Sequence, residues 1–380
     1  MRTRHTRFLM TGATVLAVGI VTPVVASQQA DNDSGFDLVS ANGAKWPGGG
    51  AAAALVEHGD DLLGPASSLL VDNGPLVTTK DGGCNNSDVS ELQDNNMNAE
   101  SMGYACHEEY GYHLADDFSL DDHCELHTIT LYAFQPDSDA NQSPISSVRL
   151  RIWDGPPNEA ESTIIYDGWE GMTLLENTFS DIYRARRSNP GSCENPIMKL
   201  VLDMKDEAIK RGDGYWLEYM IDGSRNLAGP YTPPVTEAGT PGSGNALMYD
   251  GFEGVWVECY DQGGDWYDDM PFQIHGDHLS VYLSSSGTCP GLFEFNALTD
   301  VPFSQVAFIY GLRSGSAGPV PGCTGLYVDI LQPTLIDVVS ADGSGMATLR
   351  GTVPPAACGR VRVQAIDLTN CGTSNVIITN

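Results

Sequence analysis

The segment from Val255 to Met270 alternates aromatic with acidic side chains around a Gly-Gly turn. Flat aromatic rings stack on sugar rings, and carboxylates accept hydrogen bonds from sugar hydroxyls. The pattern predicts a carbohydrate-binding loop, with candidate ligand-binding residues Trp256, Tyr260, Asp265, Trp266, Tyr267 and Asp268. The alternative interpretation places Trp256 in a protein core and leaves the acidic side chains solvated.

A second candidate site lies at Asp137, Asp139 and Asn141, where oxygen-bearing side chains occupy alternate positions, as they do in calcium loops. The segment is no EF-hand, because Gln142 and Val148 stand where that loop needs Gly and Glu. Calcium is the one cofactor that the sequence suggests. The alternative is a hairpin tip with solvated carboxylates.

Motifs for nucleophilic or zinc-dependent catalysis are missing from the sequence, which has neither GxSxG nor HExxH. Glycoside hydrolysis needs only two carboxyl groups at a suitable separation. With 50 acidic residues, a pair at such a separation is expected by chance and is no evidence for an enzyme. We therefore expect a non-enzymatic protein. The alternative is a carbohydrate-active enzyme that uses an acidic pair in its first domain.

Cysteine is the remaining chemically distinctive residue, and export favours its oxidation to disulfides. Five cysteines precede residue 288 and four follow it, which predicts up to two disulfides in each half and one leftover thiol in the first. The leftover thiol is either buried or bonded between chains. The candidates are Cys84, Cys106, Cys124, Cys193, Cys259, Cys289, Cys323, Cys358 and Cys371.

Short strands must position these residues, because apolar side chains recur at every second position. In the segment 148–153, VRLRIW, the aliphatic residues share one face and the Arg and Trp residues share the other. We expect Trp153 and Trp216 to pack against a second layer or a covering loop. The segment Cys84–Tyr112 reads as loop with short helical pieces, and Lys205–Gly214 as a short helix or polar loop.

The strand spacing, with 42 Gly and 22 Pro, predicts an all-β protein. We expect a jelly-roll-like β-sandwich followed by a smaller immunoglobulin-like β-sandwich. The predicted organisation is a signal peptide over residues 1–26, a flexible linker over 27–67, a first domain over 68–287 and a second over 288–380.

The amino terminus reads as an export signal: three arginines, then an apolar stretch, then the small-residue site Val24-Val25-Ala26. An uncleaved membrane anchor is the alternative. The net charge of -31 argues against nucleic acid and anionic membranes as partners, because both attract basic proteins. We expect a secreted, cell-surface or periplasmic protein, with no membrane span after signal cleavage.

Several phrases recur together in a known group of proteins: LVDNGPLVT, ADDFSL, RIWDGPP, YWLEY, SGNALM and PFQIHG. Over about Leu69 to Asp277 the chain resembles secreted bacterial β-sandwich proteins to which no function is assigned. Its last ninety or so residues resemble an immunoglobulin-like module that is often appended to exported bacterial proteins. The resemblance implies secretion and a sandwich fold, and it transfers no catalytic residues.

These observations predict an exported, non-enzymatic protein with a binding or structural role at the cell surface or outside the cell. A polysaccharide or another cell-surface component is the expected partner.

Overall fold

The computed structural model describes residues 67–237 and 244–380. The predicted signal peptide and all but the last residue of the predicted linker lie outside the described residues. Within them the protein is all-β, as predicted, with three 3-10 turns and no α-helix. The turns are η1 (Cys84–Asn86), η2 (Glu108–Tyr110) and η3 (Pro355–Ala357).

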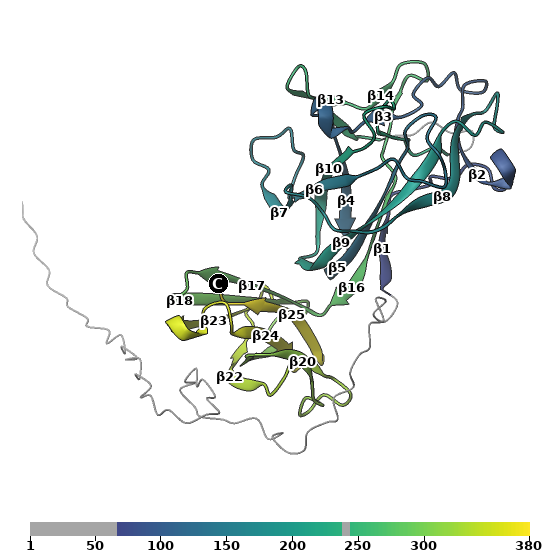
Figure 1. The fold of residues 1–380 in the computed structure, drawn as a ribbon. Helices are drawn as coiled ribbons and strands as arrows, with labels where there is room; N and C mark the ends of the chain where they lie inside the picture. Colours follow the sequence, from purple (N-terminus) through teal and green to yellow (C-terminus); the bar gives the residue numbers. More distant parts are fainter. Residues whose placement is uncertain (1–66, 238–243) are drawn as a thin grey trace, which may run out of the picture.

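Two six-stranded sheets form the first sandwich (Figure 1). The first sheet has the order β1 (Ser68–Asp72), β16 (Phe272–Leu279), β5 (His123–Ala133), β9 (Pro196–Ile209), β8 (Leu174–Arg186) and β2 (Asp88–Leu92). The second has the order β13 (Val255–Glu258), β12 (Leu247–Asp250), β4 (His113–Leu120), β10 (Gly212–Asp222), β6 (Ser147–Trp153) and β7 (Ile164–Gly168). Two short pairs complete it: β3 (Tyr104–Ala105) with β11 (Tyr231–Thr232), and β14 (Tyr260–Asp261) with β15 (Trp266–Tyr267).

The core of this sandwich is the set of side chains that alternate inward from both sheets. Leu150 of β6 and Leu217 of β10 meet Leu131 of β5 and Leu200 of β9, and all four are fully buried. The face predicted for the aliphatic residues of β6 is therefore correct. Burying each such side chain contributes about 1.5–3 kcal/mol, so the inward-facing aliphatic residues stabilise the sandwich.

One predicted element is wrong and another is correct only in part. Lys205–Gly214 is no helix: β9 continues to Ile209 and β10 begins at Gly212. Residues 207–209 stay extended because they pair with residues 124–126 of β5. The segment Cys84–Tyr112 contains the expected short helical pieces, η1 and η2, but its residues 88–92 form β2, which pairs in parallel with β8. Partners distant in the sequence decide both outcomes, and local composition does not show them.

The rest of the chain builds a seven-stranded sheet that curls around a separate core. Its order is β22 (Thr334–Ser340), β19 (Gln305–Gly311), β24 (Arg362–Asp367), β25 (Gly372–Ile378), β17 (Val281–Gly287), β18 (Gly291–Thr299) and β23 (Met346–Val353). Its two edge strands, β22 and β23, touch each other. A small sheet of β20 (Ser314–Ala317) and β21 (Val328–Ile330) lies beside it.

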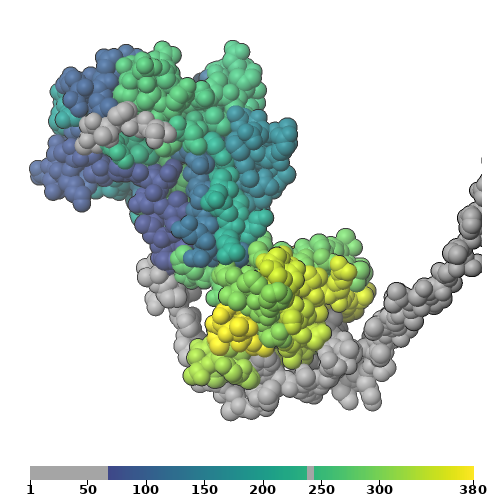
Figure 2. Space-filling model, turned by 180° about the vertical axis from the view of Figure 1, so that it is seen from behind, coloured from purple at the N-terminus to yellow at the C-terminus, as the bar shows by residue number. Residues whose placement is uncertain are grey.

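The change from one core to the other occurs earlier in the chain than the predicted boundary at residue 288. Strand β16 belongs to the first sandwich, and β17, which begins after Ser280, pairs with β18 and β25. Composition favoured the small-residue stretch 284–291 as a seam, but Ser284–Ser286 pair with β18 and so lie within a sheet. Figure 2 shows this block, green to yellow, against one end of the first sandwich.

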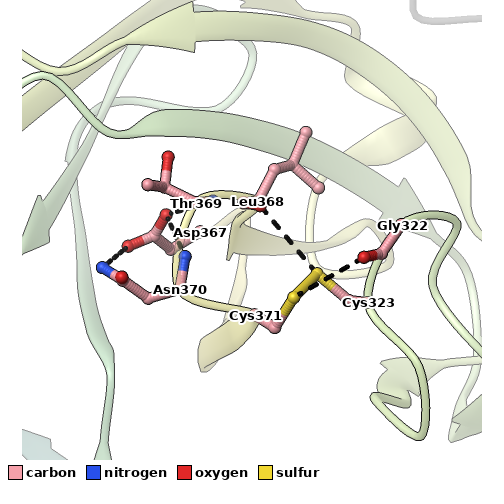
Figure 3. The surroundings of a disulfide bond; sticks show 7 residues. All are labelled: Gly322, Cys323, Asp367, Leu368, Thr369, Asn370 and Cys371. Atoms are coloured by element: carbon pink, nitrogen blue, oxygen red, sulfur yellow. Dashed lines mark hydrogen bonds between the residues drawn. A yellow bond between two sulfur atoms is a disulfide. The ribbon is translucent and has the colours of Figure 1, made fainter.

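Six of the nine candidate cysteines form disulfides: Cys84–Cys193, Cys289–Cys358 and Cys323–Cys371. The two bonds predicted after residue 288 are confirmed. Figure 3 shows Cys323–Cys371, which fastens the turn after β24. There the Asp367 carboxylate accepts hydrogen bonds from the Thr369 amide at 2.8 Å and from Nδ2 of Asn370 at 3.0 Å. Before residue 288 one bond forms and three cysteines stay reduced: Cys106, Cys124 and Cys259.

These three thiols are buried, because each occupies a core position of the first sandwich. We expect a thiol reagent to detect three thiols per chain after unfolding without reductant, and almost none in the folded protein. Burial raises the pKa of the Cys106 thiol to about 12, which suppresses the reactive thiolate. Titration with a chromogenic disulfide before and after addition of guanidinium checks this count. A single thiol after unfolding would mean that two of these core cysteines form a bond absent from the structure.

Candidate functional site

The structure divides the predicted carbohydrate-binding loop between two places. Trp256 lies on β13, opposite Tyr249 of β12. The other five candidates belong to, or lie next to, the β14–β15 hairpin, in which Tyr260 pairs with Tyr267 and Asp261 with Trp266. The six residues therefore do not form one site.

The hairpin is fastened by Asp261, which is only 2 % exposed. Its carboxylate accepts hydrogen bonds from the backbone amides of Glu100, Ser101 and Gly264, at distances between 2.8 and 3.1 Å. Asp261 therefore joins the hairpin to the segment before β3. Its role is structural, although it resembles its acidic neighbours in the sequence.

Asp268 also points inward. Its side chain accepts hydrogen bonds from the Tyr104 hydroxyl at 2.7 Å and from Nε1 of Trp266 at 3.0 Å, and the residue is 3 % exposed. Burial raises the pKa of Asp268 to about 6. The indole N–H of Trp266 is thus already bonded to Asp268 and is not available as a donor to a ligand.

Besides the half-buried Trp266, three of the predicted residues remain at least partly exposed on the hairpin. Tyr267 is 43 % exposed, Asp265 is exposed, and Tyr260 is half-buried. The Tyr260 hydroxyl donates a hydrogen bond to Asp265, and this bond raises the pKa of Tyr260. The Tyr260 and Tyr267 ring centroids are 5.1 Å apart, so this tip offers one small aromatic contact surface.

The enzyme alternative gains no support from the acidic pair at this hairpin. Asp261 and Asp268 line the same cavity, but its volume is about 20 Å³, roughly the space of a single water molecule. Hydrogen bonds from the protein already occupy both carboxylates. A sugar ring does not fit between them.

A larger aromatic surface lies on the outward face of the second sheet, and we call it the outer aromatic face. Register places its members in adjacent rows: Trp153 opposite Trp216, and His113 beside Tyr249 and Trp256. Trp169, which follows β7, covers His113 with its edge at a centroid distance of 4.8 Å. Four of the five tryptophans in the described ranges thus share this face.

Trp153 and Trp216 pack, as expected, but their partners in the cluster lie on the same face of the same sheet. Trp216 is 6 % exposed because Trp153, Trp256 and two aliphatic side chains of the same face surround it. Trp153, Trp169 and Trp256 remain partly exposed. Part of each of these three side chains is therefore accessible to solvent.

Glu218 of β10 holds the centre of this face. One carboxylate oxygen lies 2.8 Å from Nδ1 of His113, and the other accepts a hydrogen bond of 2.8 Å from Nε1 of Trp153. The Glu218 side chain is 3 % exposed. A buried carboxylate fixed at both oxygens holds the two rings in set orientations, which is the preorganisation that stacking on a rigid ligand requires.

Charged groups border the rings. The Arg151 guanidinium lies 4.1 Å above the Trp169 ring centroid and also contacts Asp167 at 3.1 Å. Arg149 donates a hydrogen bond to Glu108 at 2.7 Å and another to the Trp169 carbonyl at 3.1 Å. The loop that carries Trp169 is thus tied to the sheet through its backbone.

The most exposed rings of this region lie at one end of the face, in the turn between β12 and β13 and in η2. Phe252 is 74 % exposed and Tyr110 is 51 % exposed, with ring centroids 5.8 Å apart. Tyr112 contacts Phe252 edge-on at 5.9 Å. Exposed aromatic side chains in a cluster of this kind mark interaction sites more often than isolated ones do.

At the predicted calcium segment, Asp139 accepts hydrogen bonds from the Asn141 backbone amide at 2.9 Å and from Asn141 Nδ2 at 3.0 Å. These are the bonds of an Asx turn. Asp137 has a left-handed backbone with φ of 62°, and its amide donates to the Glu194 carbonyl. Over residues 67–237 and 244–380, no three His, Cys, Asp or Glu side chains gather closely enough to hold a metal. Calcium binding at this turn stays a prediction.

Sequence reasoning missed His113, Glu218 and Trp169 as members of one surface. The signal was present in part, since Trp153, Trp216 and Glu218 all alternate against aliphatic residues. Only the pairing of β6 with β10 and of β4 with β12 brings these positions together.

In the part of the chain that the structure describes, no helix is long and apolar enough to cross a membrane. Comparisons with known protein families, curated proteins and solved structures gave no match to this chain.

Proposed function

We propose that this is an exported carbohydrate-binding protein and that the outer aromatic face is its binding surface. The observation that carries the proposal is the partly exposed set Trp153, Trp169 and Trp256, fixed around the buried carboxylate of Glu218. A sugar chain presents apolar C–H faces and hydroxyls in alternation. Rings with charged borders match both.

Export is supported by the three disulfides, because such bonds persist in oxidising compartments outside the cytoplasm. The proposed role is binding without catalysis, at the cell surface or in the surrounding matrix. The exposed rings of Phe252 and Tyr110 extend the face beyond the sheet, so the preferred ligand is a chain of several sugar units.

Affinity electrophoresis tests this proposal with soluble xylan, starch, β-glucan and chitosan, and pull-down tests it with insoluble cellulose and chitin. We expect retention by at least one polysaccharide. The variants Phe252→Ala and Trp169→Ala should each weaken it by up to about tenfold, because one ring contact contributes about 0.5–1.5 kcal/mol. Melting temperatures should stay close to that of the wild type for Phe252→Ala, since its ring is largely exposed.

Phe303→Ala is the matched control, because Phe303 is 71 % exposed and lies outside the first sandwich. Its retention should equal that of the wild type. Tyr267→Ala tests whether the β14–β15 hairpin contributes as well. If Phe252→Ala and Trp169→Ala bind like the wild type while Tyr267→Ala does not, the hairpin is the binding site and the outer aromatic face is not.

A further inference from the structure

A cavity of about 360 Å³ opens at the edge of the first sandwich, and none of its lining residues belongs to the outer aromatic face. It lies between the end of β8, the loop that connects β8 to β9, and the β3–β11 pair. Its volume is at the lower end of the roughly 300–1,000 Å³ that small-molecule sites occupy. Only small ligands fit it.

One wall of the cavity is apolar and the other is polar. Met102, Phe134 and Tyr231 form the apolar wall, in which the Phe134 and Tyr231 rings pack at a centroid distance of 5.9 Å. Asn189, Glu194 and Asn195 contribute to the polar wall. Hydrogen-bond donors and acceptors therefore line the cavity together with aromatic side chains.

Covalent and polar bonds hold the loop that forms the polar wall. Cys193 in this loop is bonded to Cys84. At its other end the Ser188 amide and hydroxyl both donate to Asp94, at 3.1 and 2.5 Å. The Asp137 amide also donates to the Glu194 carbonyl at 2.7 Å. The cavity thus has a defined shape in the absence of a ligand.

Asn195 supplies a polar group at the inner part of this wall. It is 8 % exposed, and its Nδ2 donates to the Arg184 carbonyl at 3.0 Å. That bond fixes the side-chain amide, and Oδ1 then has no hydrogen-bond partner among the described residues. An acceptor held in this way is suited to a ligand hydroxyl.

The charges of the cavity favour a neutral ligand. Arg186 and Glu194 line it with opposite signs, and Arg186 already has Asp94 at 3.7 Å. A phosphate or a carboxylate would face Glu194, and a cation would face Arg186. A ring with hydroxyls on its edges and C–H groups on its faces satisfies both walls.

We propose that this cavity binds a single neutral sugar ring, either a free monosaccharide or the end unit of a glycan. The ring lies on Tyr231 and its hydroxyls bond to Asn195 and the opposite polar wall. The cavity shares no residue with the outer aromatic face, so this proposal holds or fails independently of the polysaccharide surface proposed above.

Saturation-transfer NMR and calorimetry on the mature chain test it, with glucose, galactose, mannose, N-acetylglucosamine and their methyl glycosides as probes. We expect at least one sugar to bind to the wild type. Ser192→Trp should reduce that binding at least tenfold, because the indole would fill the cavity from its rim. Asn189→Trp provides a second filling variant should Ser192→Trp fail to fold, as judged by its melting temperature.

Arg187→Trp is the matched control, because Arg187 is exposed on the same loop and does not line the cavity. It should bind sugar like the wild type, and so should Phe252→Ala. Short oligosaccharides ending in the preferred sugar distinguish a free monosaccharide from the end unit of a glycan as the ligand. A site for chain ends binds them as well as it binds the methyl glycoside. The proposal is overturned if no sugar binds, if both filling variants bind normally, or if zwitterionic amino acids compete for the cavity.

Discussion

Replacing Arg184 with methionine should lower the free energy of unfolding by about 3–5 kcal/mol, the range seen when a buried charged network loses one partner. Arg184 is 1 % exposed, and its guanidinium donates to the carbonyls of Ser101 and Met102 at 3.0 and 2.8 Å. It also donates to the hydroxyls of Ser90 and Thr236 at 3.1 Å. Methionine would fill the space and leave these acceptors buried without donors.

Urea unfolding followed by tryptophan fluorescence measures this loss. Burial lowers the pKa of Arg184 to about 10, so the side chain stays charged at neutral pH and the Arg184→Lys variant is informative. Lysine keeps the charge but cannot bond all four acceptors, and we expect an intermediate loss. Arg187 lies three positions further along the chain and is exposed. Arg187→Met should therefore change the free energy of unfolding by less than about 0.5 kcal/mol. A loss below about 1 kcal/mol for Arg184→Met would show that water replaces the guanidinium.

Asp261→Ala should cost about 2–4 kcal/mol, because it leaves buried backbone amides without their acceptor. Asp265→Ala should cost almost nothing, although the two residues lie in the same hairpin and one of them was predicted to bind ligand. The difference follows from the contacts: Asp261 accepts from three backbone amides, whereas Asp265 is exposed and bonds to the Tyr260 hydroxyl.

Thermal and urea unfolding of both variants measure this difference. Asp261→Asn keeps one oxygen acceptor, so we expect it to lose about half as much free energy of unfolding as Asp261→Ala. Hydrogen exchange at the Glu100 and Ser101 amides adds a local measure, since these amides should lose protection in Asp261→Ala. Equal stability of Asp261→Ala and Asp265→Ala would mean that the hairpin is not fastened in the way the structure shows.

The fold class could be predicted from the sequence because it depends on a local rule. Residues 148–153 alternate between aliphatic and polar side chains, and their buried and outward faces were predicted correctly. Polar segments were predicted poorly. Residues 205–209 have a helical composition, but Lys205 and Asp206 form a left-handed bulge and the pairing of residues 207–209 with β5 keeps those three extended.

The candidate site could be predicted only in part. Trp256 was identified, but its partners Tyr249 and His113 come from strands whose order in the sheet is not written in the sequence. Asp268 and Asp265 have the same chemistry and nearly the same position in the chain, yet one is buried and the other exposed. A burial difference between neighbouring residues of one type arises from the packing of distant segments, here Tyr104 and Arg184.

The path of the chain through the first sandwich has a practical consequence. The chain enters at Ser68, which lies beside Gly276, and it leaves at Leu279 into the seven-stranded sheet. Entrance and exit thus share one pole of the sandwich (Figure 1). His113 with the Phe252 turn, and the cavity beside Arg186, lie toward the opposite pole, where β4 begins and β8 ends. A chain held through the seven-stranded sheet would therefore keep both surfaces at the end of the first sandwich that lies away from that sheet.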